Sequence, residues 1–191
     1  MATTKPGERK LQILQTLAEM LEQPKGERIT TAALAARLDV SEAALYRHFA
    51  SKAQMFEGLI EFIESTIFGL INQIEERQEN GLSRTQAITL MLLNFAERNP
   101  GMTRVLIGDA LVNEDERLQA RMNQLIERIE LSLRQTLRAA AAQGQASEGQ
   151  VTARANLIAS FVTGRWHRFA KSGFRQNPSE GAPEQVALLL A

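Results

Sequence analysis

Cysteine is absent from this chain of 191 residues, and aromatic side chains make up only 5% of it, with a single tryptophan and a single tyrosine. The absence of cysteine excludes disulfides and thiolate metal sites, and it fits a reducing compartment. An excess of either charge is also missing, because 22 lysines and arginines balance 22 aspartates and glutamates. A strongly basic domain is the usual electrostatic footprint of a nucleic-acid-binding protein, so the net charge by itself argues against that class.

The distribution of charge along the chain weakens that argument. Residues 1–56 hold eight lysines and arginines against six acidic residues, whereas the remainder holds 14 against 16. The asymmetry is small, but its sign is the one expected if the N-terminal part faces nucleic acid.

Several other features are missing from the sequence. No apolar run approaches membrane-spanning length, and the N-terminus has no apolar signal-peptide segment, so we expect a soluble, cytoplasmic protein. There is no phosphate-binding loop, no nucleophile beside a base and, with two histidines in the chain, no cluster of metal ligands. We therefore predict that the protein is not an enzyme and uses no cofactor or metal.

Apolar residues recur at helical spacing along most of the chain, which predicts an all-α fold. We expect a three-helix head over residues 1–50 and a helical domain over residues 51–191. The first helix is expected to end at Pro24 and Gly26. The other long helices are predicted over residues 52–79, 82–98, 115–142 and 151–174, with a shorter helix from Met102 and a short apolar tail after Pro183.

Two short helices joined by a tight turn are predicted between Thr30 and Phe49. Thr30 or Thr31 can cap the first helix, and Ser41 can cap the second. Asp39 stands at the turn, where this residue type tolerates the left-handed backbone that the geometry needs. A helical pair of this kind is also common in ordinary bundles, which is the alternative interpretation.

The second of these helices has two different faces. Leu45 and Phe49 share the face that packs, whereas Ala43, Ala44, Tyr46 and Arg47 fan across a face that is free to enter the major groove of B-DNA. Arg47 is the one long donor for base edges, and the alanines can contact only thymine methyl groups.

A phosphate site is predicted directly after this helix. Ser51 and Gln54 have the spacing of a capping box, so a new helix starts at Lys52. The ammonium of Lys52 and the positive end of that helix suit one backbone phosphate, and neighbouring phosphates are within reach of Tyr46 and His48. The candidate DNA-binding residues are Thr30, Thr31, Ser41, Ala43, Ala44, Tyr46, Arg47, His48 and Lys52.

The segment Leu45–Lys52, with the sequence LYRHFASK, resembles the helix-turn-helix motif of the TetR family of bacterial regulators. One departure from that family's usual pattern is Asp39, where glycine is typical. The resemblance implies an N-terminal DNA-binding head followed by a C-terminal helical domain. It also implies a homodimer that binds palindromic DNA, because two heads about one helical turn apart, roughly 34 Å, read two half-sites.

The dimer implied by this resemblance is a four-helix bundle made by residues 125–137 and 151–169 of both subunits. Ala155, Ala159 and Gly164 are small enough to allow close approach of the helices. The alternative is that these faces complete the core of a single subunit.

Residues 60–64, 95–106 and 123–130 resemble more closely those TetR-family proteins that act in nucleoid occlusion. This resemblance implies that the DNA-bound protein engages the division protein FtsZ and prevents a septum from forming over the nucleoid. Phe62, Arg98 and Asn99 are the implied partner contacts, and an aromatic anchor beside a cation suits an apolar, acidic peptide. The alternatives are a core position for Phe62 and helix-ending chemistry for Arg98 and Asn99.

A repressor of the same fold that is released from DNA by a small molecule is the second functional hypothesis. Trp166 and His167 could line a ligand pocket in such a protein. In a lone Trp-His pair on an amphipathic helix, however, the tryptophan more often simply packs in the core and the histidine lies at the surface.

Overall fold

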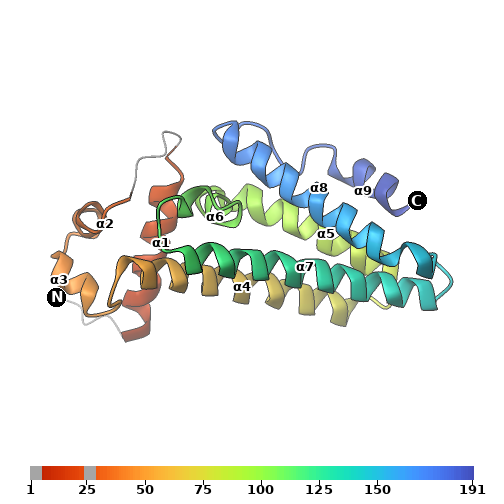
Figure 1. Cartoon of the computed structure of the whole chain (residues 1–191), viewed down its shortest axis with the longest axis horizontal. Helices are drawn as coiled ribbons and strands as arrows, with labels where there is room; N and C mark the ends of the chain where they lie inside the picture. The colour runs from red at the N-terminus through yellow and green to blue at the C-terminus, as the bar shows by residue number, and fades with distance from the viewer. Residues whose placement is uncertain (1–5, 24–28) are drawn as a thin grey trace.

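The computed structural model describes residues 6–23 and 29–191, and these ranges contain helices and no strands (Figure 1). The predicted all-α class is therefore confirmed. The elements are, in chain order, α1 (Pro6–Leu21), α2 (Thr31–Arg37), α3 (Glu42–Tyr46), α4 (Lys52–Arg77), α5 (Gly81–Arg98), α6 (Pro100–Leu106), the 3-10 turn η1 (Asp109–Leu111), α7 (Glu116–Ala142), the 3-10 turn η2 (Glu148–Gln150), α8 (Val151–Lys171) and α9 (Ala182–Leu190). No helix in the described ranges is both long enough and apolar enough to cross a membrane.

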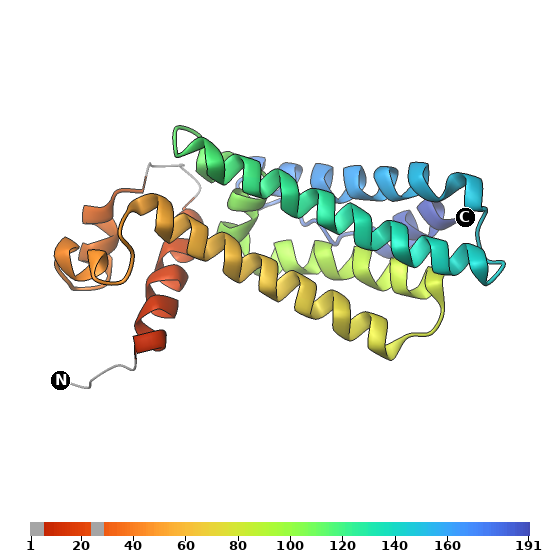
Figure 2. The same cartoon turned by 60° about the horizontal axis from the view of Figure 1, so that its bottom comes forward.

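Helices α1, α2 and α3 form a head at one end of an elongated molecule, and α4 runs from this head along the body (Figures 1 and 2). Leu17, Leu34 and Leu45 are almost fully buried where the head helices meet, as their spacing predicts. Helix α1 ends at Leu21, and the expected helix-ending residues Pro24 and Gly26 lie outside the described residues.

The body is built from the long helices α4, α5, α7 and α8, which lie side by side (Figure 2). Helix α7 packs against both α5 and α8, and its leucines at helical spacing are buried in the shared core. Inside this core the hydroxyls of Thr85 and Thr136 are 2.8 Å apart, so each polar group has a partner.

The C-terminal part differs from the sequence-based expectation. Helix α8 ends at Lys171 rather than at residue 174, because the chain turns there and Phe174 takes a left-handed backbone with φ of 62°. The apolar tail forms helix α9, which packs on α5 and α8. It begins at Ala182 because Pro183 falls in the first turn, where a missing amide hydrogen costs nothing.

Helix α6 joins the body to the head. A Cβ atom added at Gly101 of α6 would lie 1.9 Å from the carbonyl oxygen of Ala18 in α1, so only glycine allows this close approach. Arg104 of α6 donates hydrogen bonds to the carbonyl oxygens of Leu21 (3.3 Å) and Gln23 (3.4 Å) at the end of α1. The head is thus fastened to the body by backbone contact as well as by the continuous helix α4.

A carboxylate holds the other side of Arg104. The Nε of Arg104 lies 2.9 Å from Asp109, and Lys171 at the end of α8 donates to the second oxygen of the same carboxylate. Burial acts to raise the pKa of Asp109, but the hydrogen bonds from Lys171 and Arg104 outweigh it and hold this pKa below its usual value. The network connects α6, η1 and α8.

Candidate functional site

The two short helices and their turn have the geometry of a helix-turn-helix. The hydroxyl of Thr30 accepts from the amide of Ala33 at 3.1 Å, and that of Ser41 accepts from the amide of Ala44 at 3.3 Å. Asp39 has a φ of 53°, in the left-handed region, so the predicted caps and turn are confirmed. Of the two threonines proposed as caps, Thr30 is the N-cap of α2.

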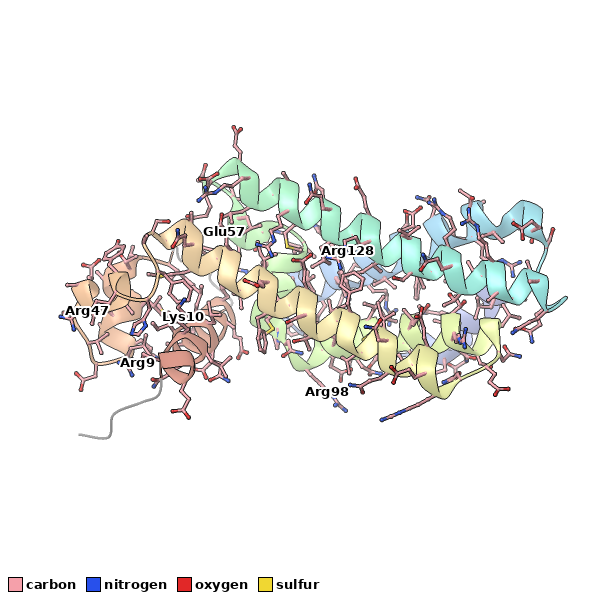
Figure 3. The ribbon with its side chains drawn as sticks, turned by 90° about the horizontal axis from the view of Figure 1, so that it is seen from below. Arg9, Lys10, Arg47, Glu57, Arg98 and Arg128 are labelled. Carbon is pink, nitrogen blue, oxygen red and sulfur yellow. The ribbon has the colours of Figure 1, made fainter. Side chains whose placement is uncertain are left out.

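Helix α3 divides its side chains between the head core and solvent. Leu45 and Phe49 are buried, whereas Tyr46 is 45% exposed and Arg47 and Ala43 are also exposed. Ala44 and His48 are half-buried. Arg47 lies at the end of the molecule furthest from the body (Figure 3). The exposed face is short and presents one aromatic phenol and one guanidinium.

A chain of hydroxyl and carboxylate groups links α2 to α3 on this surface. The hydroxyl of Thr31 donates to Glu42 at 2.6 Å, and the Tyr46 phenol lies 3.5 Å from the Thr31 oxygen. These contacts fix the mutual orientation of the two helices at the surface. They also place the negative charge of Glu42 beside Thr31, where it opposes the approach of phosphates.

The start of α4 has the expected capping box with one difference. Ser51 accepts from the amide of Gln54 at 3.1 Å, but the side-chain oxygen of Gln54 accepts from the amide of Ala50, at 2.8 Å, rather than from that of Ser51. Helix α4 therefore begins at Lys52, as predicted. The N-terminal end of α4 lies at the head (Figure 2).

Lys52 is engaged with another part of the chain. Its ammonium lies 2.5 Å from the Glu114 carboxylate and 5.6 Å from the centre of the Phe56 ring. Only 22% of the Lys52 side chain and 10% of the Glu114 side chain are exposed. A phosphate that binds Lys52 must therefore compete with Glu114.

Lys10 is a cation of this surface that sequence reasoning missed. It is exposed on α1, and its ammonium lies 5.7 Å from the centre of the Phe49 ring, directly after α3. Figure 3 shows Arg9 and Lys10 on the helix that crosses the head next to the segment bearing Arg47. No local pattern marks Lys10, because its position depends on how α1 packs across the head.

The candidate partner residues lie on α4 and at the end of α5, two helices that pack against each other. Phe62 is half-buried against the core, and Arg98 is exposed and projects from the end of α5 (Figure 3). The side-chain amide of Asn99 donates to the carbonyl oxygen of Phe95 at 2.7 Å, which is helix-ending chemistry. Of these three residues, only Arg98 carries a charge, and its side chain is exposed to solvent.

Two of the three small residues expected at a subunit interface are buried inside the single subunit instead. Ala155 and Ala159 are buried in the core of the single subunit, because the apolar stripe of α8 faces inward, and only Gly164 stays exposed. The outer surface of α7 and α8 instead carries two exposed leucines, Leu131 at 45% and Leu157 at 53%.

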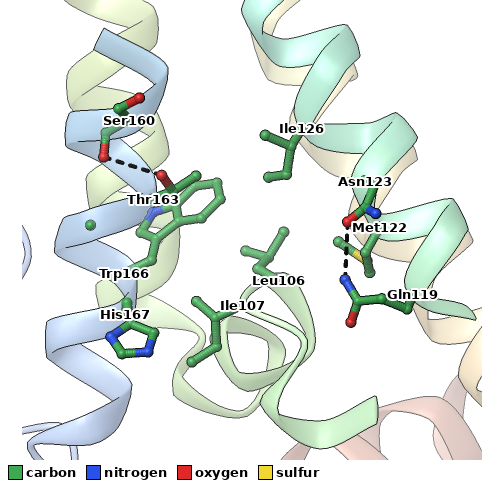
Figure 4. Close-up of a pocket in the computed structure, with 11 residues that line it drawn as sticks. Leu106, Ile107, Gln119, Met122, Asn123, Ile126, Ser160, Thr163, Trp166 and His167 are labelled. Carbon is green, nitrogen blue, oxygen red and sulfur yellow. Dashed lines mark hydrogen bonds between the residues drawn. The ribbon is translucent and has the colours of Figure 1, made fainter. Parts of the chain in front are cut away.

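A cavity of about 390 Å³ opens between α6, α7 and α8 (Figure 4). Leu106, Met122 and Trp166 contribute apolar surface, and the indole nitrogen of Trp166 donates to the carbonyl oxygen of Leu92 at 3.0 Å. His167 is exposed at its edge. Trp166 and His167 thus line a cavity, as the ligand-pocket interpretation of the sequence predicts. Trp166 is also buried in the core, as the packing interpretation predicts.

Comparison with known proteins identifies relatives of both parts of the chain. A family model described as "Bacterial regulatory proteins, tetR family" matches residues 13–59, and one described as "Tetracyclin repressor-like, C-terminal domain" matches residues 79–191. The nucleoid occlusion factor SlmA of Alteromonas mediterranea is 50% identical over 188 residues, which cover 98% of this chain and 96% of that protein. SlmA of Vibrio cholerae is 50% identical over 193 residues, which cover 100% and 98%.

The fold is shared with solved structures of lower sequence identity. The TetR family transcriptional regulator PfmR from Thermus thermophilus superimposes with a TM-score of 0.78 at 21% identity, over 93% of this chain and 96% of that one. At this identity the likeness concerns the architecture alone.

Proposed function

The chain belongs to the TetR family of bacterial regulators and, within it, to the nucleoid occlusion factors, and we propose on this basis that it binds palindromic chromosomal sites and prevents division septum assembly over the nucleoid. The observation that carries this proposal is the identity of 50% over 98% of the chain, which includes both the head and the body. The protein then works in the cytoplasm, on the nucleoid.

The head supports a specific mode of DNA binding. Arg47 and Tyr46 stand on the exposed face of α3, which is narrow enough to enter the major groove. The cation of Lys10, beside the Phe49 ring, suits a phosphate, and so does the positive N-terminal end of α4 at Lys52. Most of the affinity then comes from phosphates, with Arg47 as the main reader of base edges.

A homodimer follows from the need to hold two heads at a fixed distance on a palindrome. We place its interface on the outer surface of α7 and α8. Two exposed leucines, Leu131 and Leu157, and the exposed Gly164 support this choice, because burial of large apolar side chains stabilises association and a glycine permits close helix contact.

FtsZ is the proposed protein partner of the DNA-bound dimer. We place its contact where α4 packs against α5, with Phe62 as an apolar anchor and Arg98 as a cation for an acidic segment. Asn99 holds the end of α5 through its bond to Phe95 and so positions Arg98.

The test combines genome-wide site mapping with an assembly assay. Purified protein is mixed with sheared chromosomal DNA of its host, and the retained fragments are sequenced. Palindromes scattered over most of the chromosome and depleted where replication ends are expected. FtsZ polymer mass is then measured with protein alone and with protein plus a recovered duplex, and the duplex should be required for inhibition.

The Arg98→Ala variant should bind the duplex normally and lose inhibition of FtsZ, whereas Arg77→Ala, which removes an exposed arginine from the far end of α4, should retain both. Retention of fragments from only one or a few promoters would contradict the proposal. The cavity between α6, α7 and α8 favours a ligand-released repressor as the second candidate, and that mapping result would support it.

A further inference from the structure

A second, polar hollow lies where the chain turns from α8 into α9. Its volume is about 530 Å³, and three arginines, Arg165, Arg168 and Arg175, line it together with the amides of Gln176 and Gln185. Glu180 is the one acidic residue in its wall. The turn is near the head end of α8, on the side of the body away from α4 (Figure 1). The hollow therefore has no part in the surface around Arg47.

Arg165 holds the turn that forms this hollow, and its hydrogen bonds leave its positive charge uncompensated. Its guanidinium donates to the carbonyl oxygens of Pro178 (3.0 Å), Asn177 (3.3 Å) and Glu180 (2.5 Å), and to the side-chain oxygen of Gln185 (3.2 Å). All four acceptors are neutral groups, so they fix the turn around the arginine but leave its positive charge in place.

The two other arginines have donors to offer a ligand. The Nε of Arg175 donates to the carbonyl oxygen of Ser172 at 2.9 Å, which holds the guanidinium and leaves its terminal nitrogens available. The preceding residue, Phe174, keeps its left-handed backbone while its ring packs edge-on against Phe169, with ring centres 5.2 Å apart. Arg168 is exposed on the last turn of α8.

The lack of carboxylate partners distinguishes these arginines from others in the body. Arg104, Arg121 and Arg128 each form an ion pair at 2.6 to 2.9 Å. Within residues 6–23 and 29–191, no nitrogen of Arg165, Arg168 or Arg175 lies within 4.0 Å of a carboxylate oxygen. Burial and then the charge of Arg168 lower the pKa of Arg165, and Glu180 opposes this only in part. The positive charges of the cluster therefore repel one another, and Glu180 offsets this repulsion only in part.

We propose that this hollow binds a small soluble anion that carries a phosphate or diphosphate group. The planar guanidinium fork matches phosphate oxygens bidentately, and the amides of Gln176 and Gln185 can donate to further oxygens. The volume exceeds what one phosphate fills and lies in the range of small-molecule sites, which leaves room for the rest of a ligand. A concave site within one turn suits such a molecule better than an extended DNA backbone.

The turn is preorganised for binding. Asn177 donates to the Glu97 carboxylate at 2.6 Å, and the hydroxyl of Ser179 donates to its second oxygen, so the turn is anchored on the end of α5. A bound anion would connect α8, the turn and α9, and would stabilise the folded protein by mass action.

The experiment titrates the full-length protein with sodium pyrophosphate at constant ionic strength, using calorimetry and thermal unfolding. Three proteins are compared: the wild type, the double variant R168A/R175A and the control R77A/R138A, which removes the same charge from exposed positions on α4 and α7. Saturable binding and a higher unfolding temperature are expected for the wild type and the control. The affinity of R168A/R175A should fall by about tenfold or more.

Equal affinity in all three proteins, or no saturable binding to the wild type, would overturn the proposal. Because both substituted side chains are exposed, R168A/R175A should fold, and an unchanged affinity for operator duplex verifies this independently. The variant R168K/R175K keeps the charge but loses the fork, so it should also bind pyrophosphate more weakly. ADP and inorganic phosphate as further probes show whether the diphosphate alone or a larger molecule fits best.

Discussion

The ammonium of Lys52 lies 2.5 Å from the carboxylate of Glu114, so the first residue of α4 is tied to the segment that precedes α7. The capping box at the start of α4 predicts that Lys52 binds a DNA phosphate, yet without DNA its charge is already compensated inside the protein. Binding of DNA then exchanges one anionic partner for another, which reduces the net gain from this contact.

Replacement of Glu114 by glutamine should strengthen DNA binding by roughly two- to tenfold, because Lys52 becomes available and a negative charge near the phosphates is lost. Fluorescence anisotropy with a duplex recovered by site mapping measures the change. Glu116→Gln is the control, because Glu116 is exposed and close in sequence but does not pair with Lys52. Equal effects of the two substitutions would mean that general charge, and not the ion pair, is responsible.

Arg47 and Lys52 should differ in how their loss affects specificity. Arg47→Ala is expected to cost about 1–3 kcal/mol per half-site and to relax the preference at one base pair, because we propose that its guanidinium reads a base edge. Lys52→Ala should weaken binding to all sequences alike and reduce the dependence on salt. Binding to duplexes with single substitutions, at several salt concentrations, separates the two patterns. Identical patterns for both variants would refute the assignment of Arg47 to bases.

Gly101→Ala should destabilise the fold by about 1–3 kcal/mol, because the new methyl group would lie 1.9 Å from the carbonyl oxygen of Ala18. Gly69→Ala is the matched control within α4, where an added Cβ meets nothing within 4 Å. That change should be neutral or stabilise by up to roughly 1 kcal/mol through helix propensity. Urea unfolding of both variants checks the difference, and comparable destabilisation would show that the α1–α6 contact can relax.

Stability should fall as the pH drops through about 4, in part because of Asp109. The pKa of this carboxyl is held below its usual value by Lys171 and Arg104 despite burial, so the folded state favours the ionised form. The contribution is present above the unfolded pKa and is lost as the pH falls through the folded pKa. Asp109→Asn should flatten this part of the pH profile of unfolding, and an unchanged slope would assign the acid sensitivity to other groups.

The local features of the head could be predicted from the sequence because they depend on neighbours in the chain. The caps at Thr30 and Ser41 and the left-handed turn at Asp39 each involve residues within a few positions, and each was predicted correctly. Helix α9 was expected only as a tail, because its nine residues carry too little periodicity for a firm assignment.

Contacts between distant segments could not be predicted in the same way. The partner of Lys52 is 62 positions along the chain, and no local pattern points to Glu114. The same reason applies to Lys10 beside Phe49 and to Arg165, whose surroundings come from the turn after α8. The inward position of Ala155 and Ala159 was missed because small residues suit a subunit core as well as an interface.

The fastening of α1 to α6 through Gly101 and Arg104 has a consequence for the choice of operator. In a dimer joined through the body, this contact would hold the two heads at a fixed separation. The spacing between half-sites would then be set by helices far from the DNA. One extra base pair at the centre of a palindrome moves the two half-sites apart by about 3.4 Å and rotates one relative to the other by about 35°. A dimer with a fixed separation between its heads would bind that duplex poorly, even though the bases of both half-sites are unchanged.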